Sequence, residues 1–309
     1  MSLPDDYTTY AKRRYGQDID RYSWRPTSGR EKAALPGGAQ VGASIVVPLE
    51  WFPLTPSGEP FRHPGAMATP YPDLRHYTVR DYGNRVGAFR LLRAFAEADV
   101  KATFAVNAAL IGRASPLIDA VRDAGHEIAA HGLSTDHIHW GGLPEPDEKR
   151  FVDETRSAFE AAGLSPRAWM SPARQQSRRT PDLIRSAGFD VCLDWEPDLA
   201  PLAMTTDAGP LAAFPLLNEL DDRTLLTVKH HDEEAWRAQI VEAAAYMHAD
   251  AARRGAQCFG FTMTPYVVGQ PFRLRAVRDL LDALCAMEGV LLAPASDIVN
   301  AFAATEGGA

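Results

Sequence analysis

Short apolar runs alternate with segments of helical periodicity from residue 41 onward, and this alternation restricts the fold more than any other feature. Runs such as Ser44–Val47 (SIVV), Ala102–Val106 (ATFAV) and Glu127–Ala130 (EIAA) have the length of buried strands. Between them, stretches such as RVGAFRLLRAFAEA place apolar side chains at helical spacing. Strands that alternate with helices predict a parallel sheet with the helices outside it.

Further apolar runs bring the number of candidate strands to seven or eight, which favours a closed barrel over an open sheet. These runs are RAWM, FDVCLDW, TLLTV, CFGFTM and VLLAP. We therefore predict a distorted (β/α) barrel as a single domain over residues 41–309, preceded by a polar N-terminal arm over residues 1–40. The chain has 309 residues and is 46% hydrophobic, which is enough for one core of this size.

The charge and the cysteines restrict the class of function. A net charge of −8 repels phosphate backbones and anionic lipids, so we expect a small-molecule substrate and neither nucleic acid nor membrane as a partner. The three cysteines are widely spaced and form no CxxC pair, which is typical of free thiols in a reducing compartment. The N-terminal residues have no apolar signal segment, and no window approaches the length of a membrane span. These features predict a cytoplasmic protein.

Polar side chains follow successive candidate strands at the point where each strand ends. In a parallel barrel these carboxyl ends meet at one face, which carries the chemistry. The residues placed there by the sequence are Glu50, Trp51, His131, His137, Ser171, Arg174, Asp194, Trp195 and Thr264.

Two imidazoles and a carboxylate form a site suited to Zn²⁺ or a similar divalent ion. Glu50, His131 and His137 would supply these ligands. Because the histidines are six residues apart, their rings share a face only if the loop between them folds back. A site without a metal cofactor is the alternative.

Several segments, in order, resemble the polysaccharide deacetylase (NodB-homology) superfamily. They include GHEIAAHG, SPARQQS, AGFDVCLDW and GQPFR, and the resemblance extends from about Val41 to Phe302. Within the superfamily, the chain is most similar to the branch of cofactor-independent allantoinases and cytosolic peptidoglycan-deacetylase-like enzymes. The resemblance implies a distorted barrel of the NodB type and hydrolysis of a non-peptide carbon–nitrogen bond.

The resemblance also implies roles for particular residues. Glu50 stands where metal-dependent relatives carry an Asp-Asp pair, and a two-residue insertion would place His137 at the second histidine position. Arg174 would orient Glu50, and Asp194 matches an aspartate of the fourth motif. Where the family has His-Pro with a proton-donating histidine, this chain has Thr264-Pro265. Since threonine cannot act as a general acid near neutrality, candidates for the missing acid are His139, His230, His231 and Tyr266.

We therefore expect Glu50, His131, Arg174 and Asp194 to carry catalysis. The expected substrate contacts are Trp51, Trp169, Ser171, Trp195, Glu219 and Thr264. The favoured reaction is amide ring-opening of a small cyclic ureide or imide by activated water. The alternatives are deacetylation of an N-acetylated amino sugar and a degenerate barrel that binds a ligand without turnover. By analogy with the branch, we expect a homo-oligomer, either a dimer or a tetramer.

Overall fold

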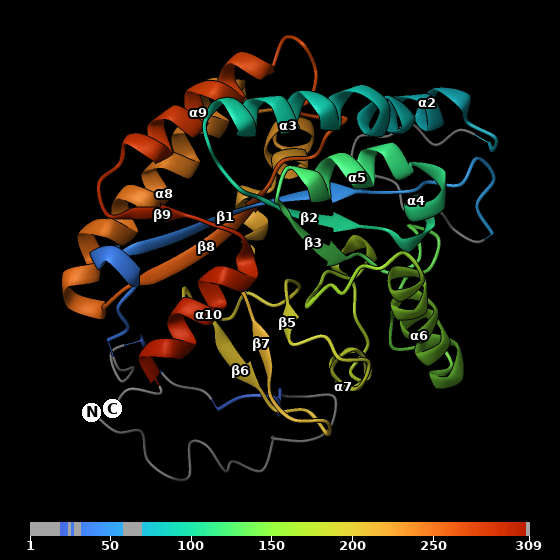
Figure 1. Cartoon of the computed structure of the whole chain (residues 1–309), viewed down its shortest axis with the longest axis horizontal. Helices are drawn as coiled ribbons and strands as arrows, with labels where there is room; N and C mark the ends of the chain where they lie inside the picture. The colour runs from blue at the N-terminus through green and yellow to red at the C-terminus, as the bar shows by residue number, and fades with distance from the viewer. Residues whose placement is uncertain (1–18, 24–25, 28–31, 58–69, 307–309) are drawn as a thin grey trace.

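The strands of the computed structural model form one curled sheet, with most of the helices packed around its outside (Figure 1). The structure describes residues 19–23, 26–27, 32–57 and 70–306. The strands are β1 (Val41–Leu49), β2 (Thr103–Val106), β3 (Glu127–Ala130), β4 (Ala168–Trp169), β5 (Val191–Cys192), β6 (Leu202–Met204), β7 (Leu211–Ala213), β8 (Gln257–Thr262) and β9 (Val290–Leu292).

The helices mostly fall between strands, as the alternation predicts. They are α2 (Leu74–Tyr82), α3 (Ala88–Glu97), α4 (Ala108–Arg113), α5 (Ser115–Asp123), α6 (Glu145–Ala161), α7 (Thr180–Ser186), α8 (Glu233–Arg254), α9 (Leu274–Ala286) and α10 (Ala295–Glu306). Two π-helical segments occur at residues 83–87 and 223–228. Among the described helices, none has both the length and the apolar character that crossing a bilayer requires.

The sheet curls into an incomplete barrel of mostly parallel strands. Its order is β6-β7-β5-β4-β3-β2-β1-β8, and β9 pairs with the first residues of β1. All pairs are parallel except β6 with β7. A parallel bridge between Leu216 and Gly260 joins the segment after β7 to β8. A Cβ on Gly260 would lie 2.7 Å from the Phe214 ring, so this close approach requires glycine. The predicted barrel is confirmed.

Alternate residues of the strands enter two separate apolar clusters. On β1, Ile45, Val47 and Leu49 join the cluster that includes the outer helices, whereas Val46 faces the barrel interior. Ala105, Ala129 and Ala168 of the next three strands also face inward, and residues 298, 299 and 302 of α10 complete this interior cluster. Because side chains alternate along a strand, Glu50 and His131 share the inward-facing parity of Val46 and Ala129.

Two local predictions are wrong. Thr224–Val228 (TLLTV), expected as a strand, lies in the π-helical segment Arg223–Val228. Its first turn is fixed by the Asp221 side chain, which accepts a hydrogen bond from the Thr224 amide. The hairpin β6–β7 was not anticipated, because its strands are only three residues long. Most of the predicted arm lies outside the described residues.

Candidate active site

Glu50 follows β1 at the carboxyl end of the barrel and is buried, with a side-chain exposure of 2%. The nearer guanidinium nitrogen of Arg223 lies 3.4 and 3.5 Å from its two carboxylate oxygens. Burial opposes ionisation of Glu50, but the charge of Arg223 and the contact with His131 lower its pKa below the ordinary value of 4.5. Glu50 is therefore a carboxylate at neutral pH.

His131 follows β3 and is oriented by a backbone carbonyl from the neighbouring strand. Its Nδ1 lies 2.8 Å from the oxygen of Met170, and because a carbonyl only accepts, Nδ1 carries the proton. In the neutral ring Nε2 then bears the lone pair, and it lies 3.7 Å from Oε1 of Glu50. Nε2 is buried and has no hydrogen-bond partner within the described part of the chain. With the ring neutral, His131 thus presents a second proton acceptor to Glu50; with the ring protonated, Nε2 carries a hydrogen towards the carboxylate, and this form of the contact lowers the pKa of Glu50.

A glycine turns the chain away directly after His131. Gly132 has a φ of 62°, and a Cβ at this position would lie 2.7 Å from the Pro172 ring. Its carbonyl accepts the Ala108 amide at the start of α4. A side chain at residue 132 would therefore disturb the placement of the imidazole.

Arg223, Tyr266 and Arg80 also lie around Glu50. Of these, the sequence pointed only to Tyr266, as one candidate for the acid. Burial lowers the pKa of Arg223, but Glu50 and Asp221 outweigh it and raise the pKa well above its ordinary value. Burial, followed by the charge of Glu50, raises the pKa of Tyr266 to about 12. Arg80 on α2 packs its guanidinium 4.2 Å from the Phe52 ring centroid and 5.4 Å from that of Tyr266. The site therefore holds two arginines near one carboxylate.

Thr264 is hydrogen-bonded to a buried aspartate from the segment after β7. The Thr264 hydroxyl donates to one carboxylate oxygen of Asp222 at 2.8 Å, and the Thr264 amide donates to the other at 2.7 Å. Burial, together with the neighbouring charge of Asp221, raises the pKa of Asp222 to about 7. The position where the resemblance expects a histidine thus carries a hydroxyl bonded to a carboxyl group that titrates near neutrality.

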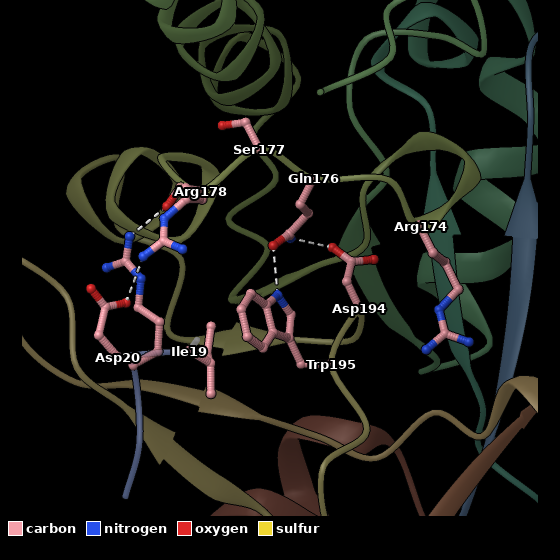
Figure 2. A pocket seen from close by; sticks show the side chains of 9 residues that line it. Ile19, Asp20, Arg174, Gln176, Ser177, Arg178, Asp194 and Trp195 are labelled. Carbon is pink, nitrogen blue, oxygen red and sulfur yellow. Dashed lines mark hydrogen bonds and ion pairs between the residues drawn. The ribbon is translucent and has the colours of Figure 1, made fainter. Parts of the chain in front are cut away.

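A pocket of about 330 Å³ opens beside Asp194 (Figure 2). Gln176 lies between Asp194 and Trp195: its amide nitrogen donates to the carboxylate at 2.5 Å, and its oxygen accepts from the indole at 2.6 Å. Burial raises the pKa of Asp194 despite the opposing charge of Arg174. Ser171 donates its amide to both Asp194 oxygens at 2.9 Å.

Arg174 lines this pocket with Asp194 and does not pair with Glu50. Its guanidinium makes no hydrogen bond or ion pair with any residue that the structure describes, and its backbone has a φ of 53°. The guanidinium that contacts Glu50 comes from Arg223, where the resemblance implies Arg174. His131 also lowers the pKa of Asp194, so its ring lies within electrostatic reach of both carboxylates.

Of the six predicted substrate contacts, Trp195 is the one found among the residues that line this pocket, and neither Glu50 nor His131 lines it. Trp169 is fully buried, donates its indole N–H to the Ser171 hydroxyl and packs against Phe189, so it is a core residue. Glu219 is on the surface, with a side-chain exposure of 78% and an ion pair to Lys229. Trp51 is half-buried, with the Arg113 guanidinium 4.8 Å from its ring centroid.

The predicted metal ligands do not come together as a set. His137 is hydrogen-bonded through Nδ1 to the Ser134 hydroxyl at 2.8 Å, and its ring packs edge-on against Phe151. No group of three histidine, cysteine or carboxylate side chains suited to a metal ion occurs among the described residues. In addition, Glu50 is already in contact with the cationic Arg223. Glu50, His131 and His137 as they lie here do not fit a divalent ion held by all three, and a metal at this site stays a prediction.

Of the candidate acids, Tyr266 lies at the site. His139 is buried against Glu148, with its Nδ1 3.4 Å from a carboxylate oxygen. His231 is hydrogen-bonded to Gln239, and His230 is exposed. The pKa of about 12 for Tyr266 makes it a hydrogen-bond donor and a weak acid near neutrality.

The comparisons with known proteins agree with this fold. Residues 76–192 match the family described as polysaccharide deacetylase. A Schizosaccharomyces pombe protein named "Putative polysaccharide deacetylase" is 23% identical over 267 residues, which cover 78% of this chain and 81% of that protein. The resemblance to the polysaccharide deacetylase superfamily, a class of hydrolases, is confirmed.

Two solved structures share the architecture. Puue allantoinase superposes with a TM-score of 0.78 at 22% identity, covering 91% of this chain and 97% of that one. A probable polysaccharide deacetylase from Pseudomonas aeruginosa PAO1 gives a TM-score of 0.79 at 21% identity, covering 89% and 96%. At this identity the likeness concerns the fold alone.

Proposed function

We propose that this chain, which matches the polysaccharide deacetylase family over residues 76–192, hydrolyses an amide carbon–nitrogen bond in a small cyclic ureide or imide. The observation that carries this proposal is the pair of buried acceptors formed by Glu50 and His131, 3.7 Å apart. A buried carboxylate that stays ionised is suited to take a proton from water.

Glu50 and His131 would activate water together. A water molecule between them donates one hydrogen to Oε1 and the other to Nε2, which satisfies both acceptors. As the water oxygen attacks the carbonyl carbon, its proton passes to Glu50, and the carbonyl oxygen takes the electron pair. Collapse of this intermediate breaks the carbon–nitrogen bond, and the nitrogen then needs a proton.

Thr264 and Asp222 would serve the leaving nitrogen. When Asp222 is protonated, it can donate to the Thr264 hydroxyl, which passes its own hydrogen to the nitrogen. The hydroxyl only relays the proton, so the high pKa of threonine is no obstacle. A ring nitrogen that leaves as part of an amide or urea is weakly basic, so a modest donor is sufficient. This favours ureides and imides over amides that release a basic amine.

The pocket beside Asp194 supports a small substrate. Its volume of about 330 Å³ is at the lower end of the range for small-molecule sites. Gln176 and the indole of Trp195 offer a planar polar group and a planar apolar face, which suit a flat heterocycle. The allantoinase of the same fold makes a cyclic ureide a natural first candidate.

Deacetylation of an N-acetylated amino sugar is the second candidate. It is favoured by the family match and by the name of the yeast relative. The chain would then act on an exocyclic amide and release a basic amine. A barrel that binds its ligand without turnover is the third.

Hydrolysis assays separate the three. Purified protein is incubated with five- and six-membered cyclic ureides, cyclic imides and N-acetylglucosamine oligomers, and products are followed by mass spectrometry. Ring-opening supports the proposal, and acetate release supports the deacetylase. If a compound raises the melting temperature and no product forms, the protein is a ligand-binding barrel. We further propose that the protein is cytoplasmic and forms a dimer or tetramer. Light scattering tests the oligomeric state.

A further inference from the structure

Two arginines from different parts of the chain lie near Glu50. Arg223, on the π-helical segment after β7, contacts both carboxylate oxygens of Glu50. Arg80, on α2, contributes to holding Glu50 ionised and therefore lies within its electrostatic range. Arg223 also lies 3.7 Å from Asp221, which orients it. The carboxylate thus has two positive charges nearby.

The guanidinium of Arg80 is buried with donors unused. The residue is 3% exposed, and one terminal nitrogen donates to the His76 carbonyl at 3.1 Å. Its Nε and its other terminal nitrogen are buried and have no hydrogen-bond partner among the described residues. No carboxylate of the described residues lies within ion-pair distance of it. Aromatic rings stabilise its charge from the side, but they leave these N–H groups unsatisfied.

Such an arrangement is unfavourable unless an anion completes it. A buried charge with unpaired donors loses its hydration without replacement. Proteins retain groups of this kind where charge develops during a reaction, since fixed donors need no reorganisation at that moment. The unused donors of Arg80 lie in the cluster with Glu50, Arg223 and Tyr266, where the proposed water attack takes place.

We infer that Arg223 and Arg80 together supply, beside Glu50, the positive charge that a divalent metal would otherwise bring. Arg223 holds the base, and the unused donors of Arg80 receive the carbonyl oxygen that gains the electron pair when water attacks. When the carbon–nitrogen bond breaks, the electron pair returns to re-form the carbonyl, and Arg80 releases it. The role of Arg80 in this inference rests on the proposed function. The incompatibility of Glu50 with a metal does not depend on that function.

The test combines metal binding with kinetics. Zn²⁺ binding to the wild-type protein and to Glu50→Gln is measured by calorimetry, and we expect the two isotherms to superimpose. After exhaustive chelation, the wild-type rate should stay within about twofold of its starting value. Arg80→Gln should lower kcat by about 10²-fold with KM nearly unchanged, as loss of one oxyanion donor does. Arg80→Lys, which keeps the charge and is the safer variant for folding, should recover part of this loss.

Arg90→Gln is the matched control. Arg90 also lies over an aromatic ring, that of Tyr82 at 5.7 Å, and it donates to a backbone carbonyl, but it belongs to α3 and does not contribute to the charge around Glu50. Zn²⁺ binding that disappears in Glu50→Gln would overturn the inference, as would a rate lost on chelation and restored by metal. Equal kcat values for Arg80→Gln and Arg90→Gln would overturn the role of Arg80. If wild-type protein hydrolyses nothing while the isotherms superimpose, the proposed function fails and the exclusion of metal by arginine stands.

Discussion

Nε2 of His131 lies 3.7 Å from Oε1 of Glu50, and both side chains are 2% exposed. The Met170 carbonyl places the proton of the neutral ring on Nδ1, so in that form the nitrogen that faces the carboxylate is an acceptor. Two buried acceptors at this distance repel each other unless a donor lies between them. Water is the donor that hydrolysis supplies.

Replacing His131 removes one of these acceptors. His131→Ala should lower kcat by roughly 10²–10⁴-fold, the usual contribution of a proton acceptor. His131→Gln, which retains a hydrogen-bonding group, should fall between this variant and wild type. Steady-state kinetics on the best substrate checks this, with circular dichroism as the control for folding. Unchanged turnover in His131→Ala would remove the imidazole from the mechanism.

The pH profile should report the lowered pKa of Glu50. Because the base acts when deprotonated, kcat/KM should persist as pH falls and decline only below the ordinary pKa of 4.5. Arg223→Lys should move this decline to higher pH, since a lysine holds the carboxylate less well. Profiles measured on both proteins, in a range where each remains folded, check the shift. A decline at the same pH in both would show that Arg223 does not control Glu50.

Asp222 should make the folded protein less stable as pH rises. Its pKa is raised from 3.8 to about 7 by burial and by Asp221, so the folded state binds this proton more tightly than the unfolded chain. The stability it contributes is present below pH 4 and is lost as pH rises through 7. The free energy of unfolding of wild type relative to Asp222→Asn should therefore decrease from pH 5 to pH 8. Urea titrations at several pH values measure it, and a difference that does not vary with pH would contradict the assignment.

Asp222 should also matter more for some substrates than for others. If it feeds a proton through Thr264, Asp222→Asn and Thr264→Val should slow substrates in proportion to the basicity of the leaving nitrogen. Imides, whose nitrogen is weakly basic, should lose the least. Rates on a series of ring substrates check this, and a uniform loss across the series would indicate a purely structural role for the pair.

Trp195 should act through binding. Its indole is held by Gln176 at the edge of the pocket, so Trp195→Ala should raise KM by about tenfold, in line with loss of one aromatic contact, with little change in kcat. Trp140, which is 51% exposed and is not among the residues of this pocket, provides the matched control. If both tryptophan variants behave alike, the substrate does not bind against Trp195.

The sequence was sufficient for residues that directly follow strands. Glu50 and His131 lie on the inward parity of β1 and β3, and both strands are apolar enough to be recognised from their side chains alone. The inward or outward direction of a side chain is harder to predict where a strand is short. The strand β4 has two residues, and Trp169 on it points into the core although its position resembled that of a substrate contact.

Arg223 was missed because of the segment in which it lies. Thr224–Val228 has the β-branched composition of a strand, but the Asp221 side chain caps it as a π-helical turn and directs Arg223 towards Glu50. The Asp-Asp-Arg run at 221–223 was the available signal, since three consecutive charged residues directly before the apolar run TLLTV need partners. The position of His137 was hard to predict for a related reason: its loop folds towards Phe151 and Ser134, which spacing alone does not reveal.

Hydrolysis by Glu50→Gln after chelation tests the central claim most directly. Wild-type and variant protein are treated with chelator, and ring-opening of the best cyclic ureide or imide is followed at neutral pH. We predict that wild type retains its rate and that the variant loses at least about 10²-fold, because the amide side chain cannot accept the proton of water. Comparable rates for the two folded proteins would show that this carboxylate is not the base.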